Sequence, residues 1–388
     1  MKKSLLALAV FGAFSGAVFA QSNVQLYGII DMGVTHFTGI APAGGGSGTV
    51  SSTGLSSGVG SSDRIGLKGT EDLGGGLKAF FTAETGFCGS GLNQDGTTIQ
   101  TTPNQTFCTG GGFMQRQAFV GLAGGFGTLS LGRQYTPAFL SENAVDPFGS
   151  GLTGSDLDMG LVSHFPLLPV YALIRANQEA AYVTPDLSGF KGTVAYSFAP
   201  LAAGTVPTVS GAGSNVARSM AVNGQYANGP VMAGLTYTRL TNLYANPPLS
   251  AVNDGAFKMW QAYGSYDFGI AKLSGIYEKA SADYSTGNST YWMLGTTIPV
   301  GPGAILASYG QNKNDVTTAT NPVPAGTAKE YAIGYTYSLS KRTDLYTSYA
   351  HISNGAGTAL AVNSPSDSFK GVVGQGASGF ALGIRHKF

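Results

Sequence analysis

Apolar and polar side chains alternate along this chain from Val24 to its last residue, in segments of about ten residues separated by turns or polar loops. The last segment, residues 377–388, is the clearest. One face of this segment carries Phe380, Leu382, Ile384 and Phe388. The other face carries Ala381, Gly383, Arg385 and Lys387. Successive side chains of a β-strand point to opposite faces, so a period of two predicts strands. The alternation therefore predicts an all-β protein.

The apolar face of these segments is rich in tyrosine, phenylalanine and leucine, as in residues 328–339 and 270–279. Charged residues make up 11% of the chain, against roughly 25% in a typical soluble domain. After the N-terminus, no apolar run reaches the roughly 18 residues that a membrane-spanning helix needs. These features exclude a helical membrane protein and argue against a nucleic-acid binder. They favour strands that turn their apolar face towards lipid.

The links between the candidate strands fall into two length classes. Short links such as 74–76 alternate with long ones such as 38–61, 88–112 and 354–376. Short turns at one end and long loops at the other are typical of a transmembrane β-barrel with an even number of strands. Sixteen strands would enclose a lumen too wide for side chains to fill, so we expect a water-filled pore. The sixteen expected strands are 24–34, 62–72, 76–87, 113–123, 127–136, 175–184, 189–199, 217–227, 230–240, 256–268, 270–281, 288–299, 302–313, 328–339, 342–353 and 377–388.

Residues 1–20 have the features of a secretory signal peptide. Lys2 and Lys3 precede an apolar stretch, and Ala-Val-Phe-Ala at 17–20 matches the small-x-small pattern of a cleavage site. Cleavage after Ala20 leaves residues 21–388, a single barrel domain with 19 basic and 20 acidic side chains. The protein is therefore expected to be exported.

The two cysteines, Cys88 and Cys108, flank a polar segment and have no Cys-x-x-Cys spacing or nearby histidine that would complete a zinc site. An oxidising compartment favours a disulfide between them, and two free thiols are the alternative. The four histidines show no metal-ligand spacing either: His36, His164, His351 and His386. We therefore expect neither a metal, nor a cofactor, nor an enzymatic activity.

One connection breaks the alternation. Between Tyr135 and Arg175 the chain shows no period of two, and residues 137–174 contain four prolines and four acidic residues. A structureless loop of this length is usually functional, although an ordinary surface loop is the alternative.

Several stretches resemble the general Gram-negative porin family in its β-proteobacterial branch. They include VQLYGIIDMGV (24–34), SDRIGLKGTEDLGGGLKAFFTAETGF (62–87), RQAFVGLAGGFGTLSLGRQYTP (116–137) and the terminal GFALGIRHKF (379–388). The resemblance implies a trimer of sixteen-stranded antiparallel barrels in the outer membrane, each with an inward-folded constriction loop, here about 137–174. Family members often carry Pro-Glu-Phe-Gly in that loop. This chain has Asp-Pro-Phe-Gly at 146–149, so the acid is displaced.

The resemblance also implies a basic wall that faces an acidic loop at the narrowest part of the pore. Arg64, Arg116 and Arg175 match the wall, and Glu142 and Asp146 match the loop. Strand parity independently turns Arg64, Lys68, Lys78 and Arg175 into the lumen, together with Glu84 and Glu179. Parity is ambiguous for Arg116. Such fixed charges tune ion preference, and their near balance predicts weak selectivity with a slight preference for anions.

Two further residues are expected to act outside the lumen. Arg133 shares parity with the outward-facing Leu129 and Leu131. An arginine on a lipid face is costly at mid-depth, so it lies either in the headgroup region or against a neighbouring barrel. Phe388 resembles the terminal aromatic residue that the barrel-insertion machinery reads in this family.

The sequence as a whole indicates an outer-membrane porin for passive diffusion of small hydrophilic solutes and ions, surrounded by outer-membrane lipid and without a nucleic-acid partner. A substrate-specific channel on the same fold is one alternative. A structural or adhesive outer-membrane protein that acts through its external loops is another, and bilayer recordings without conductance would favour it.

We predict that Cys88 and Cys108 form a disulfide in the loop after the third expected strand. Closing a loop of about 20 residues would contribute roughly 3 kcal/mol through restriction of the unfolded chain. Thiol labelling of the denatured, unreduced protein should leave both cysteines unlabelled. Labelling of both would show that the bridge does not form.

Overall fold

The structure is a computed structural model that describes residues 23–42, 47–90, 114–161, 171–198, 218–241, 256–283, 286–315, 325–365 and 367–388. Seventeen strands are named within these ranges, with three short helices. The helices are α2 (Pro137–Asn143), the 3-10 helix η1 (Asp156–Asp158) and α3 (Tyr171–Ile174). The strands are β1 (Asn23–Ile40), β2 (Val50–Ser57), β3 (Arg64–Gly74), β4 (Leu77–Gly86), β5 (Gln117–Gly124), β6 (Gly127–Tyr135), β7 (Arg175–Val183), β8 (Phe190–Ser197), β9 (Arg218–Asn228), β10 (Val231–Thr241), β11 (Phe257–Asp267), β12 (Lys272–Ala282), β13 (Ser289–Val300), β14 (Gly303–Asn314), β15 (Gly326–Ser338), β16 (Thr343–Asn354) and β17 (Ala377–Lys387).

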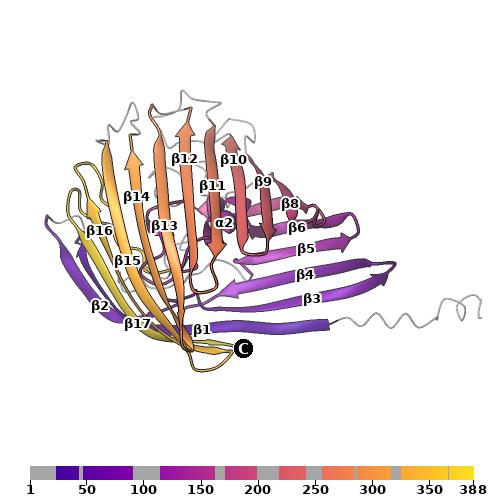
Figure 1. Cartoon of the computed structure of the whole chain (residues 1–388), viewed down its shortest axis with the longest axis horizontal. Helices are drawn as coiled ribbons and strands as arrows, with labels where there is room; N and C mark the ends of the chain where they lie inside the picture. The colour runs from indigo at the N-terminus through magenta and orange to yellow at the C-terminus, as the bar shows by residue number, and fades with distance from the viewer. Residues whose placement is uncertain are drawn as a thin grey trace, which may run out of the picture.

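These strands form one closed antiparallel barrel. Apart from β2 and β3, which both pair with β1, each strand pairs with its neighbour in the chain, and β17 returns to pair with β1. β2 and β3 lie end to end along β1, with β2 beside its second half and β3 beside its first half. They therefore share one place, and the described strands fill sixteen places around the barrel. In Figure 1, β9 to β16 run upright on one wall while β3 to β6 run across on the other, as expected when barrel strands tilt by roughly 40°.

The expected alternation of faces is confirmed in the strands. In β17 the side chains of Phe380, Leu382 and Ile384 are exposed, whereas Ala377 and Ala381 are buried. In β15, Tyr331 and Ile333 are exposed while Glu330 is buried. Because a barrel has its polar contents inside, the exposed apolar face is the one that meets lipid.

Two of the expected boundaries are wrong. β1 continues to Ile40, and β2 lies inside the expected loop 38–61. Residues 58–63 then leave the sheet, and the backbone N–H of Gly58 donates to the carbonyl of Asp31. β2 is rich in serine and has one exposed large apolar side chain besides its first residue, so its alternation is too weak to read from the sequence.

Several predictions fall on residues outside the described ranges. The signal peptide and the cleavage site lie there, as does Cys108. Cys88 is described and does not carry a free thiol. Its pairing with Cys108 remains a prediction. Within the described residues, no helix has the length and apolar character needed to cross a membrane.

The barrel is closed at a seam between Gly28 of β1 and Phe388. Each residue donates its backbone N–H to the carbonyl of the other, at 3.0 and 3.1 Å. Gly28 has no side chain, and the ring of Phe388 occupies the space that a side chain would need. A Cβ built on Gly28 would lie 2.2 Å from Cζ of Phe388 and 2.7 Å from the carbonyl oxygen of Arg64. The last residue of the chain is thus part of the barrel wall.

Replacing Gly28 with alanine should therefore weaken the seam. The added methyl group must displace the Phe388 ring and meets the Arg64 carbonyl, and overpacking of this kind typically costs about 1–3 kcal/mol. Reversible urea unfolding in detergent micelles would measure the loss. Gly224→Ala in β9 is the control, because a Cβ there meets nothing within 4 Å. Equal stability of the two variants would contradict the packing described for the seam.

Candidate functional site

The segment that follows β6 turns into the barrel, and its two ends are tied together. Thr136 donates its backbone N–H to the carbonyl of Ile174 and its hydroxyl to the carbonyl of Leu173. The same hydroxyl oxygen caps α2 by accepting from the backbone N–H of Phe139. Pro137 begins the helix, where a missing N–H costs nothing. The sequence therefore favours a helix start at the point where the chain leaves the wall.

The first described part of this segment, residues 137–161, lies along the inward face of the barrel wall. We call it the lumen segment; α2 is visible behind the upright strands in Figure 1. Its polar contacts go to side chains of β10, β11, β12, β14 and β16. These contacts are Ser141–Thr236 at 2.6 Å, Gln261 to the Ala138 carbonyl at 3.3 Å, Ser274 to the Val145 carbonyl at 2.5 Å, Asn312 to the Met159 carbonyl at 2.7 Å and Thr153–Ser348 at 2.9 Å.

The three arginines that the family resemblance matched lie together on the other side of the lumen. Arg116 and Arg175 both donate to the hydroxyl oxygen of Tyr135, at 2.8 and 2.9 Å. The guanidinium carbon of Arg175 also lies 4.5 Å from the centre of the Tyr135 ring, a cation–π contact. Tyr135 in turn stacks on Phe139 of α2, with ring centroids 4.8 Å apart. A single tyrosine thus joins the two buried arginines to the lumen segment.

Glu84 completes this arginine cluster. Its carboxylate accepts from Nε of Arg116 at 2.7 Å and lies 3.9 Å from Nε of Arg64. It also accepts from the hydroxyl of Tyr27 at 3.0 Å. The guanidinium groups of Arg64 and Arg116 therefore share one carboxylate, so positive charge exceeds negative charge around Glu84. Arg64 is the most exposed of the three, since Arg116 and Arg175 are only 2% and 1% exposed.

Arg116 faces the lumen because the strand is irregular where it begins. Arg116 precedes β5 at a bend, and its backbone N–H donates to the carbonyl of Glu84, the residue that pairs with Gln117. Two consecutive residues thus stand opposite one residue of β4, as at a β-bulge. This shift is why parity alone was ambiguous there.

Lys68 and Lys78 do not lie at the level of the arginine cluster. Both face inward as expected, with Lys68 opposite Thr82 and Lys78 opposite Asp72. Lys68 is four residues nearer the short turn than Arg64, about 13 Å along the strand, and its Nζ lies 5.3 Å from the Tyr27 ring centre. Lys78 is six residues from Glu84, about 20 Å. Parity predicts the face of a residue but not its depth, and the assignment of both lysines to the basic wall of the constriction stays a prediction.

The expected acids do lie on the lumen segment, but they do not face the arginines. Glu142 is fully buried, and its Oε1 accepts from the backbone N–H of Leu161. Burial and the neighbouring carboxylates of Glu278 and Asp146 raise the pKa of Glu142 well above its ordinary value. Within the described residues, no ion pair joins Glu142 or Asp146 to an arginine. These acids are packed between the segment and the wall.

Asp146 has a structural role of its own. Its carboxylate accepts from the backbone N–H groups of Phe148 and Ser150, at 2.9 and 2.7 Å, and so holds the turn of the Asp-Pro-Phe-Gly stretch. Burial also raises the pKa of Asp146. The turn directs the Phe148 ring towards Gly334 of β15, where a Cβ would come within 2.9 Å of the ring. The displaced acid of this stretch thus fixes the tip of the lumen segment against the wall.

Arg133 is held within its own chain. Its Nε donates to the carbonyl of Gln115 at 2.5 Å, and Nη1 donates to the side chain of Asn177. The half-buried guanidinium of Arg133 therefore joins the residues that precede β5 to Asn177 of β7. The two predicted surroundings of Arg133, lipid headgroups or a neighbouring barrel, both stay predictions.

Sequence reasoning missed three parts of this site. Tyr27 has inward parity, which was the available signal, but aromatic residues were assigned to the lipid face as a class. Tyr135 shares parity with the outward-facing Leu129 and Leu131, and it turns inward only after the register shift between Gly132 and Gln134, which parity does not predict. Glu278, which faces inward on β12, is buried beside the Glu142 carboxyl. The loop before β17 also reaches inward: the backbone N–H of Asn363 donates to Asp158 of η1 at 2.8 Å.

A closed barrel with an apolar outer face, a charged lumen and an inward segment defines a transmembrane channel. Comparison with known proteins gives the same class. The sequence model of the Gram-negative porin family matches residues 6–357, so the chain belongs to this family.

The individual relatives agree with this assignment. Outer membrane porin protein 32 of Delftia acidovorans is 31% identical over the full length of both chains. An outer membrane porin protein of Bordetella pertussis is 29% identical over 93% of this chain and 98% of its own. A solved structure described as an anion-selective porin from Comamonas acidovorans has a TM-score of 0.73 and 29% identity, covering 95% of this chain and all of its own. The protein is accordingly an outer-membrane porin.

Tyr135→Phe should destabilise the barrel measurably. Removal of the hydroxyl deletes two hydrogen bonds from buried guanidinium groups, and a hydrogen bond to a charged group is worth about 1.5–3 kcal/mol. Urea unfolding in micelles would detect this loss. Tyr182→Phe is the control, since its hydroxyl donates to the Phe126 carbonyl at an exposed position. A Tyr135→Phe barrel as stable as the control would contradict the bridging role of this hydroxyl.

Proposed function

We propose that the lumen segment narrows the pore of this porin and that the arginine cluster gives it a preference for anions. The observation that carries the proposal is the sharing of one carboxylate, Glu84, by Arg64 and Arg116 on the lumen face, with Arg175 joined to Arg116 through the hydroxyl of Tyr135. Fixed charge at a narrow point acts on every permeating ion. The pore passes small hydrophilic solutes and ions by passive diffusion, and we assign it no catalytic step.

The preference for anions should be stronger than the weak preference that a count of the charged residues at the constriction predicts. The acids expected to balance the arginines, Glu142 and Asp146, are buried behind the lumen segment, and this burial raises the pKa of both carboxyls because it disfavours their charged form. The solved relative from Comamonas acidovorans is described as anion-selective, which supports the same direction.

We propose further that the barrel forms a homotrimer, as the family resemblance implies, and that Phe388 is read by the barrel-insertion machinery. The position of Phe388 in the seam supports a role in closing the barrel as well. The two roles are separable. Phe388→Leu should lower the amount of barrel in the outer membrane of cells, and refolding of the same variant in detergent would report on the seam alone.

Replacing Arg64 and Arg116 with glutamine should shift the zero-current potential in a salt gradient towards cation preference. The control is the pair Lys68→Gln and Lys78→Gln, which removes the same charge about 13–20 Å further along the strands and should shift it less. Planar bilayer recordings of barrels that migrate as folded on unheated gels would make the comparison. Equal shifts in the two pairs would show that the cluster does not set the selectivity.

The pH dependence of selectivity tests the placement of the loop acids. A carboxyl with a raised pKa is neutral at low pH and becomes charged only as the pH rises. Raising the pH should therefore add negative charge behind the lumen segment and reduce the anion preference. Glu142→Gln with Asp146→Asn should flatten this dependence and, at neutral pH, change selectivity less than the arginine pair does. A pH dependence unchanged in this variant would contradict the assignment.

A further inference from the structure

A pocket of about 340 Å³ opens into the lumen from β1, β3 and β4, on the short-turn side of the arginine cluster. We call it the wall pocket. Strand register sets its inward-facing side chains in two rows. Gln25, Lys68 and Thr82 form the row nearer the arginine cluster, and Asn23, Thr70 and Phe80 form the other. Their strand neighbours Val24, Leu26 and Leu67 are exposed on the outer face, so the pocket faces water and not lipid.

The polar side chains of the wall pocket are not used within the barrel. Among the described residues, no hydrogen bond or ion pair engages the side chains of Asn23, Gln25, Lys68, Thr70 or Thr82. The amides and hydroxyls can each donate and accept, and the ammonium group offers three donors. Five polar groups that face one pocket are therefore free to bind a solute.

Phe80 adds an apolar surface to the pocket. Its ring lies over Gly121 of β5, where a Cβ would come within 2.4 Å of Cζ of Phe80. The ring of Phe119 packs against it nearly edge to face, with centroids 6.3 Å apart and an interplanar angle of 78°. The glycine and the second ring thus hold Phe80 against the wall, and the half-buried ring leaves part of its surface to the pocket.

Lys68 gives the wall pocket a positive charge. Its Nζ lies 5.3 Å from the centre of the Tyr27 ring, at the edge of the pocket nearer the arginine cluster. Glu84, two residues from Thr82 on β4, is already bound to Arg116 and does not neutralise it. An anion that leaves the arginine cluster along this wall meets Lys68 about 13 Å further on.

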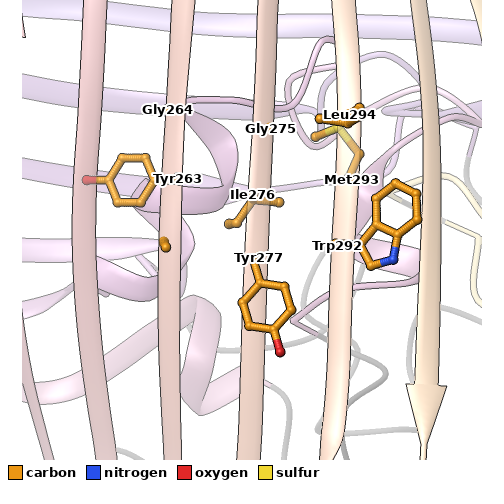
Figure 2. Close-up of a pocket in the computed structure, with 9 residues that line it drawn as sticks. Tyr263, Gly264, Gly275, Ile276, Tyr277, Trp292, Met293 and Leu294 are labelled. Atoms are coloured by element: carbon orange, nitrogen blue, oxygen red, sulfur yellow. The ribbon is translucent and has the colours of Figure 1, made fainter.

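A pocket on the lipid-facing surface has the opposite character. It has a volume of about 480 Å³ and runs across β11, β12 and β13. Tyr277, Trp292 and Leu294 line it beside Gly264 and Gly275 (Figure 2). No charged side chain is among its lining residues. Of these two pockets, only the wall pocket has the groups that a charged and hydroxylated solute requires.

We propose that the wall pocket binds a sugar acid, a pyranose with one carboxylate, as it passes through the pore. This inference rests on the anion preference proposed above and adds a class of solute to it. Lys68 binds the carboxylate, the amides and threonines bind the hydroxyl groups, and the C–H face of the ring packs on Phe80. Ligand pockets typically combine an apolar surface with a few polar groups that fix orientation. Binding is weak, because a conducting channel must also release the solute.

The test records the chloride current through single wild-type channels in planar bilayers while D-glucuronate is added at constant chloride concentration. Glucuronate should reduce the current saturably. D-glucose, which lacks the carboxylate, should need about a tenfold higher concentration for half block. Acetate should also need a higher concentration than glucuronate, because it has neither the ring nor the hydroxyl groups.

Two variants locate the block. Lys68→Gln should raise the half-blocking concentration of glucuronate about tenfold and leave that of glucose unchanged. Its matched control is Lys272→Gln, which removes the same charge from a lumen-facing position at the same end of β12, outside the wall pocket, and should have no effect. Phe80→Leu should weaken the block by glucuronate but not by acetate. Migration on unheated gels verifies that each variant is folded.

Four results would overturn the site: glucuronate that blocks no better than glucose, acetate that blocks as well as glucuronate, equal effects of the two lysine variants, or no effect of Phe80→Leu. The second of these would reveal a simple anion site. The zero-current potential of the wild type in a potassium chloride gradient separates this inference from the proposed function. Any of the four results with the anion preference intact counts against the wall pocket alone, whereas a missing anion preference contradicts the proposed function itself.

Discussion

Every strand of this protein depends on backbone hydrogen bonding to two neighbours. In hydrocarbon an unpaired N–H or carbonyl group has no water to bind, so a sheet can cross a membrane only when it has no edge. The chain meets this requirement by pairing β17 with β1 and by extending the seam to its last residue. The close contact of the Phe388 ring with Gly28 follows from that closure.

Closure separates two surfaces with different requirements. The outer surface needs only to be apolar, and leucine, tyrosine and phenylalanine side chains at alternate positions of the strands meet this requirement. The inner surface can hold charges because it faces water and the lumen segment. That segment is fixed at its ends by Thr136, along its length by polar contacts with the wall, and at its tip by the Asp146 turn. The arginine cluster on the opposite wall reaches the segment through Tyr135.

The alternation of apolar and polar side chains was enough to predict the barrel, its strand number and most strand boundaries. A closed sheet with lipid on one face and the lumen on the other directly requires this alternation. It failed for β2, whose serines leave little contrast between the two faces. It also predicted the face of Lys78 without its depth. Glu142 was placed on the right segment, but the direction of its carboxyl depends on contacts with Leu161 and the wall, which lie far from it in sequence. Arg116 was assigned to the lumen by resemblance to the family alone, because β5 begins irregularly and parity was ambiguous at this position.

We propose that the lumen segment rests against the wall of β10 to β16 in the conducting channel. The hydroxyl oxygens of Ser141 and Thr236 lie 2.6 Å apart, so a cysteine at each position could form a tether. Single-channel conductance of the Ser141→Cys, Thr236→Cys variant should be measured before and after oxidation, with the native cysteines retained. We predict that the tether forms and leaves conductance and ion preference unchanged. A tether that does not form, or one that changes the conductance markedly, would contradict the account.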